Sequence, residues 1–236
     1  MSALPSSSAS TSASVQAQRP QSRQDRSRHT EQVLLEAALQ LFRERGFEAI
    51  TVGDIASRAG VAPASIYRRF GDKEGLLREA YRHFTSHALA MLETMPTATH
   101  QHSYVECLAL VTSLVMRYSH ANQHLLQSSF VRALVDDYYA QALKELRAGV
   151  LTVLKRHFLE LAHEIHHPEP ALAVDFALRQ AVAMLSARLE NGQLEVGAGA
   201  MDEPVFLREL MRSILGYLQV SFTSDEVDAA LRRHGL

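Results

Sequence analysis

One short segment in the first third of the chain combines small, hydrogen-bonding and cationic side chains at helical spacing. Ser65 and Tyr67 carry hydroxyl groups, and they follow a run of small residues, Ala-Pro-Ala, at 62–64. Arg68 and Arg69 add two guanidinium groups. Arginine can bind a phosphate or the acceptor edge of guanine. These residue types are therefore typical of a helix that enters the major groove of DNA.

Two short helices joined by a tight turn would have to position these side chains. Thr51 and Asp54 form an S/T-x-x-D/E pattern, in which the hydroxyl caps a free backbone N–H and the carboxylate reaches back. Gly60 suits the turn because glycine adopts φ > 0 without steric cost, and Pro63 suits the first position of the second helix. Asp72 can cap the helix that follows. The positions expected to face inward are Ile55, Ala56, Ile66 and Phe70.

Each part of this pattern also occurs in proteins that bind no nucleic acid. A single T-x-x-D cap is common, an arginine pair usually lies on a solvated face, and glycine joins short helices in many bundles. It is the combination at compatible spacing that favours DNA binding. Lys73 supports the DNA-binding interpretation. A cation in the first turn of a helix is repelled by the positive end of the helix dipole, and a DNA phosphate nearby would offset that repulsion.

The segment from Arg28 to Tyr81 resembles the DNA-binding domain of TetR-type transcriptional repressors. The resemblance rests on the runs LLEAALQLFRERGFEAITVGDIASRAGV and DKEGLL, with an IY…F pattern between them. It implies an all-α fold, in which an N-terminal three-helix helix-turn-helix domain is joined by a fourth helix to a C-terminal helical domain. That second domain is expected to bind a small effector and to dimerise.

The resemblance also implies DNA contacts at seven positions, and the residue chemistry adds Arg68. The expected DNA-binding residues are Thr51, Pro63, Ala64, Ser65, Tyr67, Arg68, Arg69 and Lys73. Two positions depart from the family pattern. Ala62 stands where the family usually has a capping serine, which removes a cap typically worth about 1 kcal/mol, and Arg69 replaces a more usual Tyr or His. The base preference of a relative therefore does not transfer to this chain.

Charge and cysteine content agree with an intracellular DNA-binding protein. Residues 1–94 contain 12 Lys/Arg and 10 Asp/Glu, whereas residues 95–236 contain 12 and 16, so the more basic end carries the expected helix-turn-helix. Cys107 is the only cysteine, which excludes an intrachain disulfide and fits a reducing cytoplasm. The N-terminal residues lack the apolar core of a signal peptide, and the apolar stretch 104–116 is too short to span a membrane.

Composition predicts three parts. Residues 1–26 form a Ser/Ala/Gln-rich tail expected to be disordered, residues 27–94 form the helix-turn-helix domain with its linking helix, and residues 95–236 form the effector-binding and dimerisation domain. The arginines near the end of the tail are Arg19, Arg23, Arg26 and Arg28. They either contact the minor groove and phosphates, as basic arms do, or belong to a solvated tail without a role.

Apolar spacing and helix breakers predict helices throughout the rest of the chain. The first spans 30–45 and is ended by Gly46, against which Phe47 packs back. A long loop is expected at 192–204 because of its glycines, and Ser224 is expected to cap the last helix. The further helices are expected near 72–93, 103–120, 122–135, 137–166, 169–191, 203–222 and 225–234.

Two of these helices have more apolar surface than one neighbour can cover. The segment 169–191 is apolar almost all round, and 203–222 carries a broad stripe that includes Leu210 and Ile214. A helix that is apolar on most sides is buried on most sides. One interpretation is a central helix of a monomeric bundle. The other, which the family resemblance favours, is a four-helix interface between two copies of the chain.

The middle helices are expected to enclose a pocket for an unidentified effector. Aromatic and methionine side chains suit a mostly apolar cavity, although they are also ordinary core residues. The candidate lining residues are Cys107, Met116, Phe130, Tyr138, Phe158 and Met184. Three charged residues within apolar stretches, Glu106, Arg132 and Arg179, could orient a polar group of the ligand or face solvent.

One motif points to a different class of protein. His163-Glu164-Ile165-His166-His167 matches H-E-x-x-H, in which two histidines on one helix face bind zinc and the glutamate acts as base. Pro168 argues against it, because the residue before a proline is biased out of helical geometry, and no third ligand is obvious downstream. We therefore expect neither an enzyme nor a bound metal or cofactor. A non-specific architectural DNA binder is disfavoured by the large acidic second half.

The sequence thus predicts a cytoplasmic, homodimeric, ligand-responsive repressor. Each subunit would insert the helix 62–70 into the major groove, so that a dimer binds two half-sites of a palindromic operator in double-stranded DNA. A ligand that binds the DNA-incompetent state more tightly would release the protein from its operator.

Overall fold

The computed structural model describes residues 23–95, 103–191 and 201–236. Within these ranges the chain forms α-helices and one short 3-10 helix, and no strand, which confirms the all-α fold. The N-terminal helices are α1 (Arg23–Arg45), α2 (Val52–Ala59), α3 (Ala64–Phe70) and α4 (Lys73–Glu93). They are followed by α5 (Tyr104–Ala121), α6 (Gln123–Ala133), α7 (Asp137–Leu159), the 3-10 helix (Ala162–Glu164), α8 (Pro170–Asn191), α9 (Glu203–Leu218) and α10 (Ser224–Arg233).

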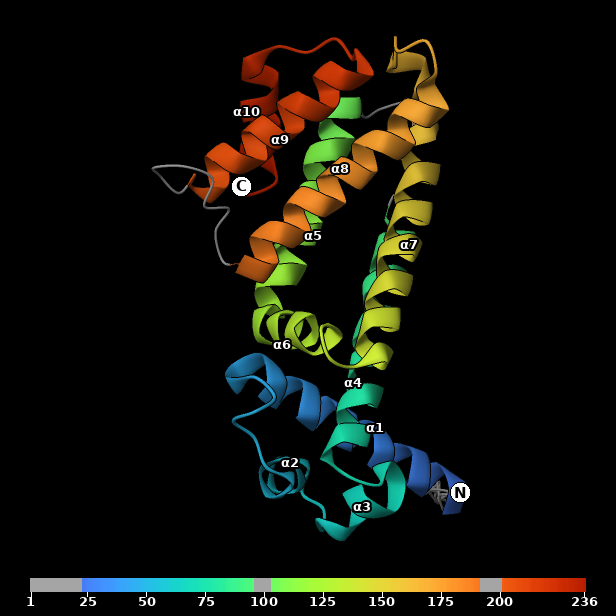
Figure 1. The fold of residues 1–236 in the computed structure, drawn as a ribbon, viewed down its shortest axis with the longest axis vertical. Helices are drawn as coiled ribbons and strands as arrows, with labels where there is room; N and C mark the ends of the chain where they lie inside the picture. The colour runs from blue at the N-terminus through green and yellow to red at the C-terminus, as the bar shows by residue number, and fades with distance from the viewer. Residues whose placement is uncertain (1–22, 96–102, 192–200) are drawn as a thin grey trace, which may run out of the picture.

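The molecule is elongated, with α2 and α3 at one end and α8 to α10 at the other (Figure 1). Helix α4 runs from the α1–α3 unit into the bundle formed by the later helices, and α6 lies across the middle between them. Helix α4 therefore connects the bundle directly to the α2–α3 end of the molecule.

Helix α1 begins at Arg23, seven residues before its expected start at Thr30. Asp25 lies in its first turn, where the positive end of the helix dipole stabilises a carboxylate. Residues 23–26 are therefore helical and not disordered as expected, and the rest of the expected tail lies outside the described residues. The helix ends as expected at Gly46, which has φ 73°, and the Phe47 ring lies 5.6 Å from the ring of Phe42.

The buried side chains form two cores that do not divide at the expected domain boundary near residue 94. The upper core joins α5 and α7–α10 with the end of α4. The lower core joins α1, α2, α3 and the first part of α4, but it also includes Leu125 and Leu126 of α6 and Tyr139 of α7. Helix α4 contributes to both cores, its first part to the lower one and its end to the upper one.

The apolar stripe of α9 lies inside the protomer. Leu210 and Ile214 are each 3% exposed, because α9 packs against α5, α8 and α10. The stripe therefore fits the monomeric-bundle interpretation, and these two residues cannot contact a second copy of the chain. Large apolar side chains that do face outward are found on α8, where Leu172 and Phe176 are 56% and 54% exposed.

Three helix ends differ from the sequence-based expectation. The N-cap of α10 is Thr223 and not Ser224: its hydroxyl accepts the Glu226 N–H at 3.2 Å, and the Glu226 carboxylate accepts the Thr223 N–H at 2.7 Å. Helix α9 ends at Leu218, because Gln219 adopts a left-handed conformation with φ 56°. Helix α7 ends at Leu159, and the chain continues into the 3-10 helix.

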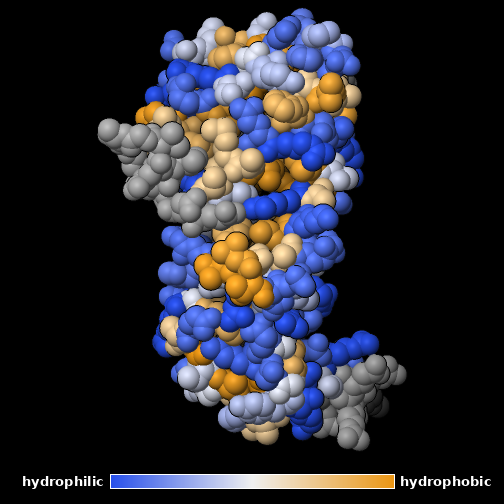
Figure 2. Space-filling model, viewed as in Figure 1, coloured by the Kyte–Doolittle hydropathy of each residue, from blue (hydrophilic) through white to orange (hydrophobic). Residues whose placement is uncertain are grey.

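Most of the visible surface in Figure 2 is hydrophilic, with an apolar patch in the region where Figure 1 places α6. The corner between α6 and α7 carries exposed large apolar side chains, namely Val131, Leu134 and Val135, which are 66%, 84% and 86% exposed. Among the described residues, no helix is long and apolar enough to cross a membrane.

Candidate nucleic-acid interface

The first helix of the motif is closed at both ends by the expected residues. The Thr51 hydroxyl oxygen accepts the Asp54 N–H at 3.1 Å, and the Asp54 carboxylate accepts the Thr51 N–H at 2.8 Å. The side-chain hydrogen bond from the Thr51 hydroxyl, followed by the one from its backbone, lowers the pKa of the Asp54 carboxyl. At the other end Gly60 has φ 66°, and Val61 N–H donates to Ala56 C=O at 3.0 Å. This left-handed C-cap turns the chain toward α3.

Helix α3 is anchored by the buried Ile66, with the half-buried Phe70 packed against the same core, and one of its faces is open to solvent. Ile66 is fully buried, whereas Tyr67 is 55% exposed and Arg68 is exposed. Pro63 and Ala64 at the start of the helix are exposed, and Pro63 makes no side-chain cap. The Ser65 and Ile66 N–H groups at this end of the helix donate to the Ala62 and Pro63 carbonyl oxygens, each at 2.9 Å.

Arg69 does not share the open face of Tyr67 and Arg68. It is half-buried, and its Nη2 lies 3.5 Å from Ser27 Oγ of α1, at the limit of a hydrogen bond. Its Nε and Nη1 are enclosed without a hydrogen-bond partner among the described residues. The guanidinium borders a surface hollow that Glu31 and Glu79 also line.

Lys73 lies at the start of α4, beside the turn from α3. Asp72 is the N-cap of α4, as expected, because its carboxylate accepts the Gly75 N–H at 2.7 Å. The Lys73 ammonium lies 4.2 Å from the centre of the Phe47 ring, which holds the cation through its attraction to the ring face. With the exception of Thr51, at the start of α2, the expected DNA-binding residues therefore lie on α3 and beside its two flanking turns.

Comparison with known proteins identifies this arrangement. The family model described as "Bacterial regulatory proteins, tetR family" matches residues 34–80. The "Uncharacterized HTH-type transcriptional regulator YvkB" of Bacillus subtilis is 27% identical over 63% of this chain and 80% of its own length. The "HTH-type transcriptional repressor KstR2" of Rhodococcus jostii is 47% identical, over 22% of this chain and 25% of its own length. Residues 34–80 thus form a DNA-binding domain of the TetR family.

The fold of this chain is shared by solved structures over most of its length. One of them, "Salmonella enterica GusR", superposes with a TM-score of 0.59 at 20% identity and covers 81% of this chain and 96% of its own. Because the proteins that match it in sequence are HTH-type transcriptional regulators, the chain is a DNA-binding transcriptional regulator and not an enzyme.

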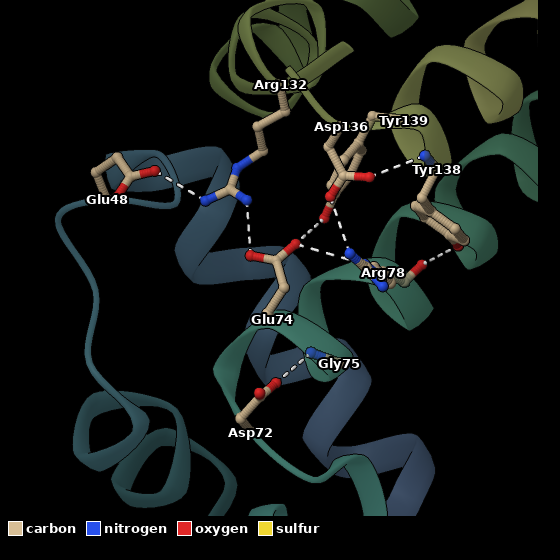
Figure 3. Close-up of polar contacts among 9 residues, drawn as sticks. All are labelled: Glu48, Asp72, Glu74, Gly75, Arg78, Arg132, Asp136, Tyr138 and Tyr139. Atoms are coloured by element: carbon tan, nitrogen blue, oxygen red, sulfur yellow. Dashed lines mark hydrogen bonds and ion pairs between the residues drawn. The ribbon is translucent and has the colours of Figure 1, made fainter. Parts of the chain in front are cut away.

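The DNA-binding unit of this regulator is joined to the later helices by a polar junction centred on Arg132 (Figure 3). The Arg132 guanidinium binds Glu74 of α4 at 2.6 Å and Glu48, between α1 and α2, at 2.9 Å. It also lies 4.0 Å from the ring centre of Phe47 and 5.6 Å from that of Tyr139. The sequence did not predict this role, because the two carboxylates lie 58 and 84 residues from Arg132 in the chain.

Tyr139 and a second ion pair complete the junction. The Tyr139 hydroxyl donates to Glu74 at 2.8 Å, and burial followed by this hydrogen bond raises the pKa of the phenol. Arg78 of α4 binds Asp136 at 2.9 Å, and its carbonyl accepts the Tyr138 hydroxyl at 2.9 Å (Figure 3). The start of α7 is therefore fixed to α4 next to Arg132.

A mostly apolar cavity of about 160 Å³ lies above this junction, between helices α4 to α9 of the regulator. Two of the expected lining residues, Phe130 and Phe158, do border it. Cys107 and Met116 are buried elsewhere in the upper core, and Met184 packs against that core. Tyr138 lies at the junction instead. The charged lining residue in the described part of the chain is Arg147.

None of the three charged residues considered for the ligand borders the cavity. Glu106 of α5 pairs with Arg233 of α10, Arg179 pairs with Asp175 on its own helix, and Arg132 belongs to the junction. Residues Phe84 and Ala88 of α4, together with Phe130 of α6, do line it. The cavity therefore borders α4 and α6, two of the helices that meet at the junction.

The H-E-x-x-H run has no zinc-binding geometry. His163 lies in the 3-10 helix, and His166 and His167 follow it in non-helical chain. The Glu164 carboxylate accepts the Tyr104 N–H at 3.0 Å, so it caps the start of α5. His166 Nδ1 lies 3.0 Å from the Gln219 carbonyl oxygen. Within the described ranges, no group of three His, Cys, Asp or Glu residues is placed to hold a metal ion.

Proposed function

We propose that this regulator is a homodimeric cytoplasmic repressor that binds a palindromic operator through α3 and leaves it when a small apolar molecule fills the cavity. The observation that carries the proposal is the exposed face of α3, with Tyr67 and Arg68 mounted on the buried Ile66 at the far end of the molecule. The relative KstR2 is named a repressor, which supports the direction of regulation. Selection of binding sites from random double-stranded DNA tests it, because a repressor of this kind selects an inverted repeat.

We assign residues 27–94 to DNA binding and residues 95–236 to effector binding and dimerisation. In the proposed complex Tyr67 and Arg68 read base edges, while the small side chains of Pro63 and Ala64 let the helix approach them. Ser65 donates to a phosphate, and so does the Thr51 hydroxyl once it leaves the Asp54 carboxylate, to which it donates at 2.6 Å. The cations Arg69 and Lys73 neutralise phosphates beside α3. Arg69 would have to leave Ser27 to do so.

Substitution of the cations should separate base contacts from phosphate contacts. Lys73→Ala and Arg69→Ala are expected to weaken operator and random DNA alike, and each should reduce the salt slope by about one unit because one phosphate contact is lost. Arg68→Ala is expected to relax the preferred base at one position, by roughly 1–3 kcal/mol if the contact is bidentate to guanine. Fluorescence anisotropy at several salt concentrations, with selection from random DNA, measures both.

Arg156→Ala is a matched control, since Arg156 is an exposed arginine near the distal end of α7. It removes the same charge far from α3 and should change neither quantity. If all three test variants kept both the selected motif and the wild-type salt slope, the assigned contacts would be wrong.

The cavity supports a small, largely apolar effector. An apolar cavity of about 150 Å³ in another protein stays dry and binds benzene, and the volume here is about 160 Å³. Because Phe84 and Ala88 of α4 line it, a ligand has direct contact with the helix that leads to α3. Ligand binding and DNA binding would then weaken each other by the same factor.

Filling the cavity should block this response. Ala181→Phe, at a lining position of α8, is expected to abolish the thermal stabilisation of the regulator by small aromatic compounds such as toluene and indole, while DNA affinity stays at the wild-type level. A compound at 100 times its Kd stabilises a protein by about 2.7 kcal/mol, which thermal unfolding detects. Ala148→Phe, at an exposed position of α7, is the control and should retain the response. A full thermal response in Ala181→Phe would place the binding site elsewhere.

A further inference from the structure

Arg132 joins three segments that are distant in the sequence. It lies in the last turn of α6 and touches α4 through Glu74 and the α1–α2 connection through Glu48, at 2.6 and 2.9 Å. Its guanidinium also faces the ring of Phe47, whose centre is 4.0 Å away. One side chain of the effector domain therefore holds two separate parts of the DNA-binding unit.

The chemistry of this contact suits a geometric restraint. A guanidinium is a rigid planar fork, so its hydrogen bonds to two carboxylates fix direction as well as distance. The Arg132 side chain is only 20% exposed, so solvent screens its pairs less than it screens a fully exposed pair. The Glu48 side chain is 84% exposed, and that arm is the weaker of the two.

Other contacts across the junction restrain one element each. Arg78 and Asp136 link α4 to the start of α7 at 2.9 Å, and Arg43 Nε of α1 donates to Asn122 at 2.6 Å. Neither reaches both α4 and the connection that precedes α2. Of these polar contacts, the one made by Arg132 ties both α4 and the α1–α2 connection to the later helices, in addition to the apolar packing of α6 against α1.

We propose that Arg132 is a positioning residue that sets the half-site separation accepted by the dimer. The inference rests on the proposed palindrome-binding dimer. Each base pair adds about 3.4 Å along the duplex, so a modest rotation of the DNA-binding unit moves α3 by one base pair. A restrained unit accepts one spacing, whereas a loosened unit accepts neighbouring spacings as well.

The test uses the full chain and operators in which the selected half-sites are moved apart or together by one and two base pairs. Wild-type protein is expected to lose about tenfold or more in affinity on a one-base-pair change, because both half-sites can no longer be bound at once. Arg132→Met keeps an apolar side chain of similar length against Phe47 but removes both ion pairs. It should bind the shifted operators within about threefold of the original, with the half-site motif unchanged.

Matched variants separate this role from general stability. Arg132→Lys keeps the charge but not the planar guanidinium, and its discrimination between operator spacings should lie between those of wild type and Arg132→Met. Glu48→Gln should reduce this discrimination less than Glu74→Gln does. Arg82→Met is the control, because Arg82 pairs with Glu79 on the same helix and should keep wild-type discrimination. If Arg132→Met does not fold, as judged by circular dichroism, the Glu48→Gln/Glu74→Gln double variant carries the same test.

Wild-type discrimination in a folded Arg132→Met variant, or in the double variant, would overturn the inference. A changed half-site motif would overturn it as well, because it would mean that Arg132 acts on base recognition. If the wild-type protein itself selects no paired half-sites, the proposed function fails instead, and the inference fails with it.

Discussion

Replacement of Gly75 by alanine is expected to abolish operator binding. Gly75 lies in the first turn of α4, and a Cβ atom there would lie 1.9 Å from the carbonyl oxygen and 3.1 Å from the carbonyl carbon of Phe70. Both atoms belong to the backbone at the end of α3, so no side-chain rotation can relieve the overlap. Either the end of α3 or the start of α4 must move, and α3 then no longer lies where its anchor Ile66 places it.

The affinity of Gly75→Ala for the operator should fall to its affinity for random DNA, which for specific regulators is typically a loss of about 10³-fold or more. Overpacking of this kind also costs about 1–3 kcal/mol of folding free energy, so thermal unfolding should shift as well. Gly53→Ala is the matched control, because the added Cβ meets only the Thr51 hydroxyl oxygen, at an ordinary 3.5 Å. Near wild-type operator affinity in Gly75→Ala would show that the α3–α4 turn adapts.

Phe176→Glu is expected to give a monomer that binds a palindrome weakly. Phe176 is 54% exposed on α8, and its ring lies 5.3 Å from that of Tyr217 on α9. We place the dimer interface on this outward face of α8 and α9, where a buried, unpaired carboxylate would oppose association. Because joining two half-sites raises affinity by about 10² to 10⁴ without new contacts, the palindrome should lose that factor while a single half-site is unaffected.

Sedimentation of the full chain, together with titration of single and paired half-sites, measures both effects. Leu134→Glu is the control, since Leu134 is a still more exposed apolar residue at the α6–α7 corner, at 84%. A Phe176→Glu variant that still sediments as a dimer would exclude this face. Charges at Leu210 or Ile214 would be uninformative, because these side chains lie in the protomer core.

The local structure of the DNA-binding unit could be predicted from the sequence because its determinants are close together in the chain. The cap of α2 depends on Thr51 and Asp54, and the turn after it depends on Gly60 alone. The start of α4 depends on Asp72 and a backbone N–H three residues later. Each of these involves residues within a few positions, whose chemistry fixes the local backbone.

The remaining features depend on contacts between distant residues. The stripe on α9 shows which face of the helix is buried, but apolar spacing does not distinguish a neighbouring helix of the same chain from a second copy. Aromatic and methionine content likewise does not distinguish a cavity wall from solid core, so Phe130 and Met116 looked alike. Arg132 looked like a ligand-orienting group because the carboxylates that bind it are far away in sequence.

The lower core has a consequence for protein engineering. Leu125 and Tyr139 are each 1% exposed and Leu126 is 7% exposed, and all three cover the DNA-binding unit from helices of the effector domain. A chimera cut in the loop after α4 would therefore leave apolar surface of the transplanted DNA-binding unit exposed to solvent. A biosensor that joins this DNA-binding unit to a ligand-binding domain of another protein would have to include the α6–α7 corner as well.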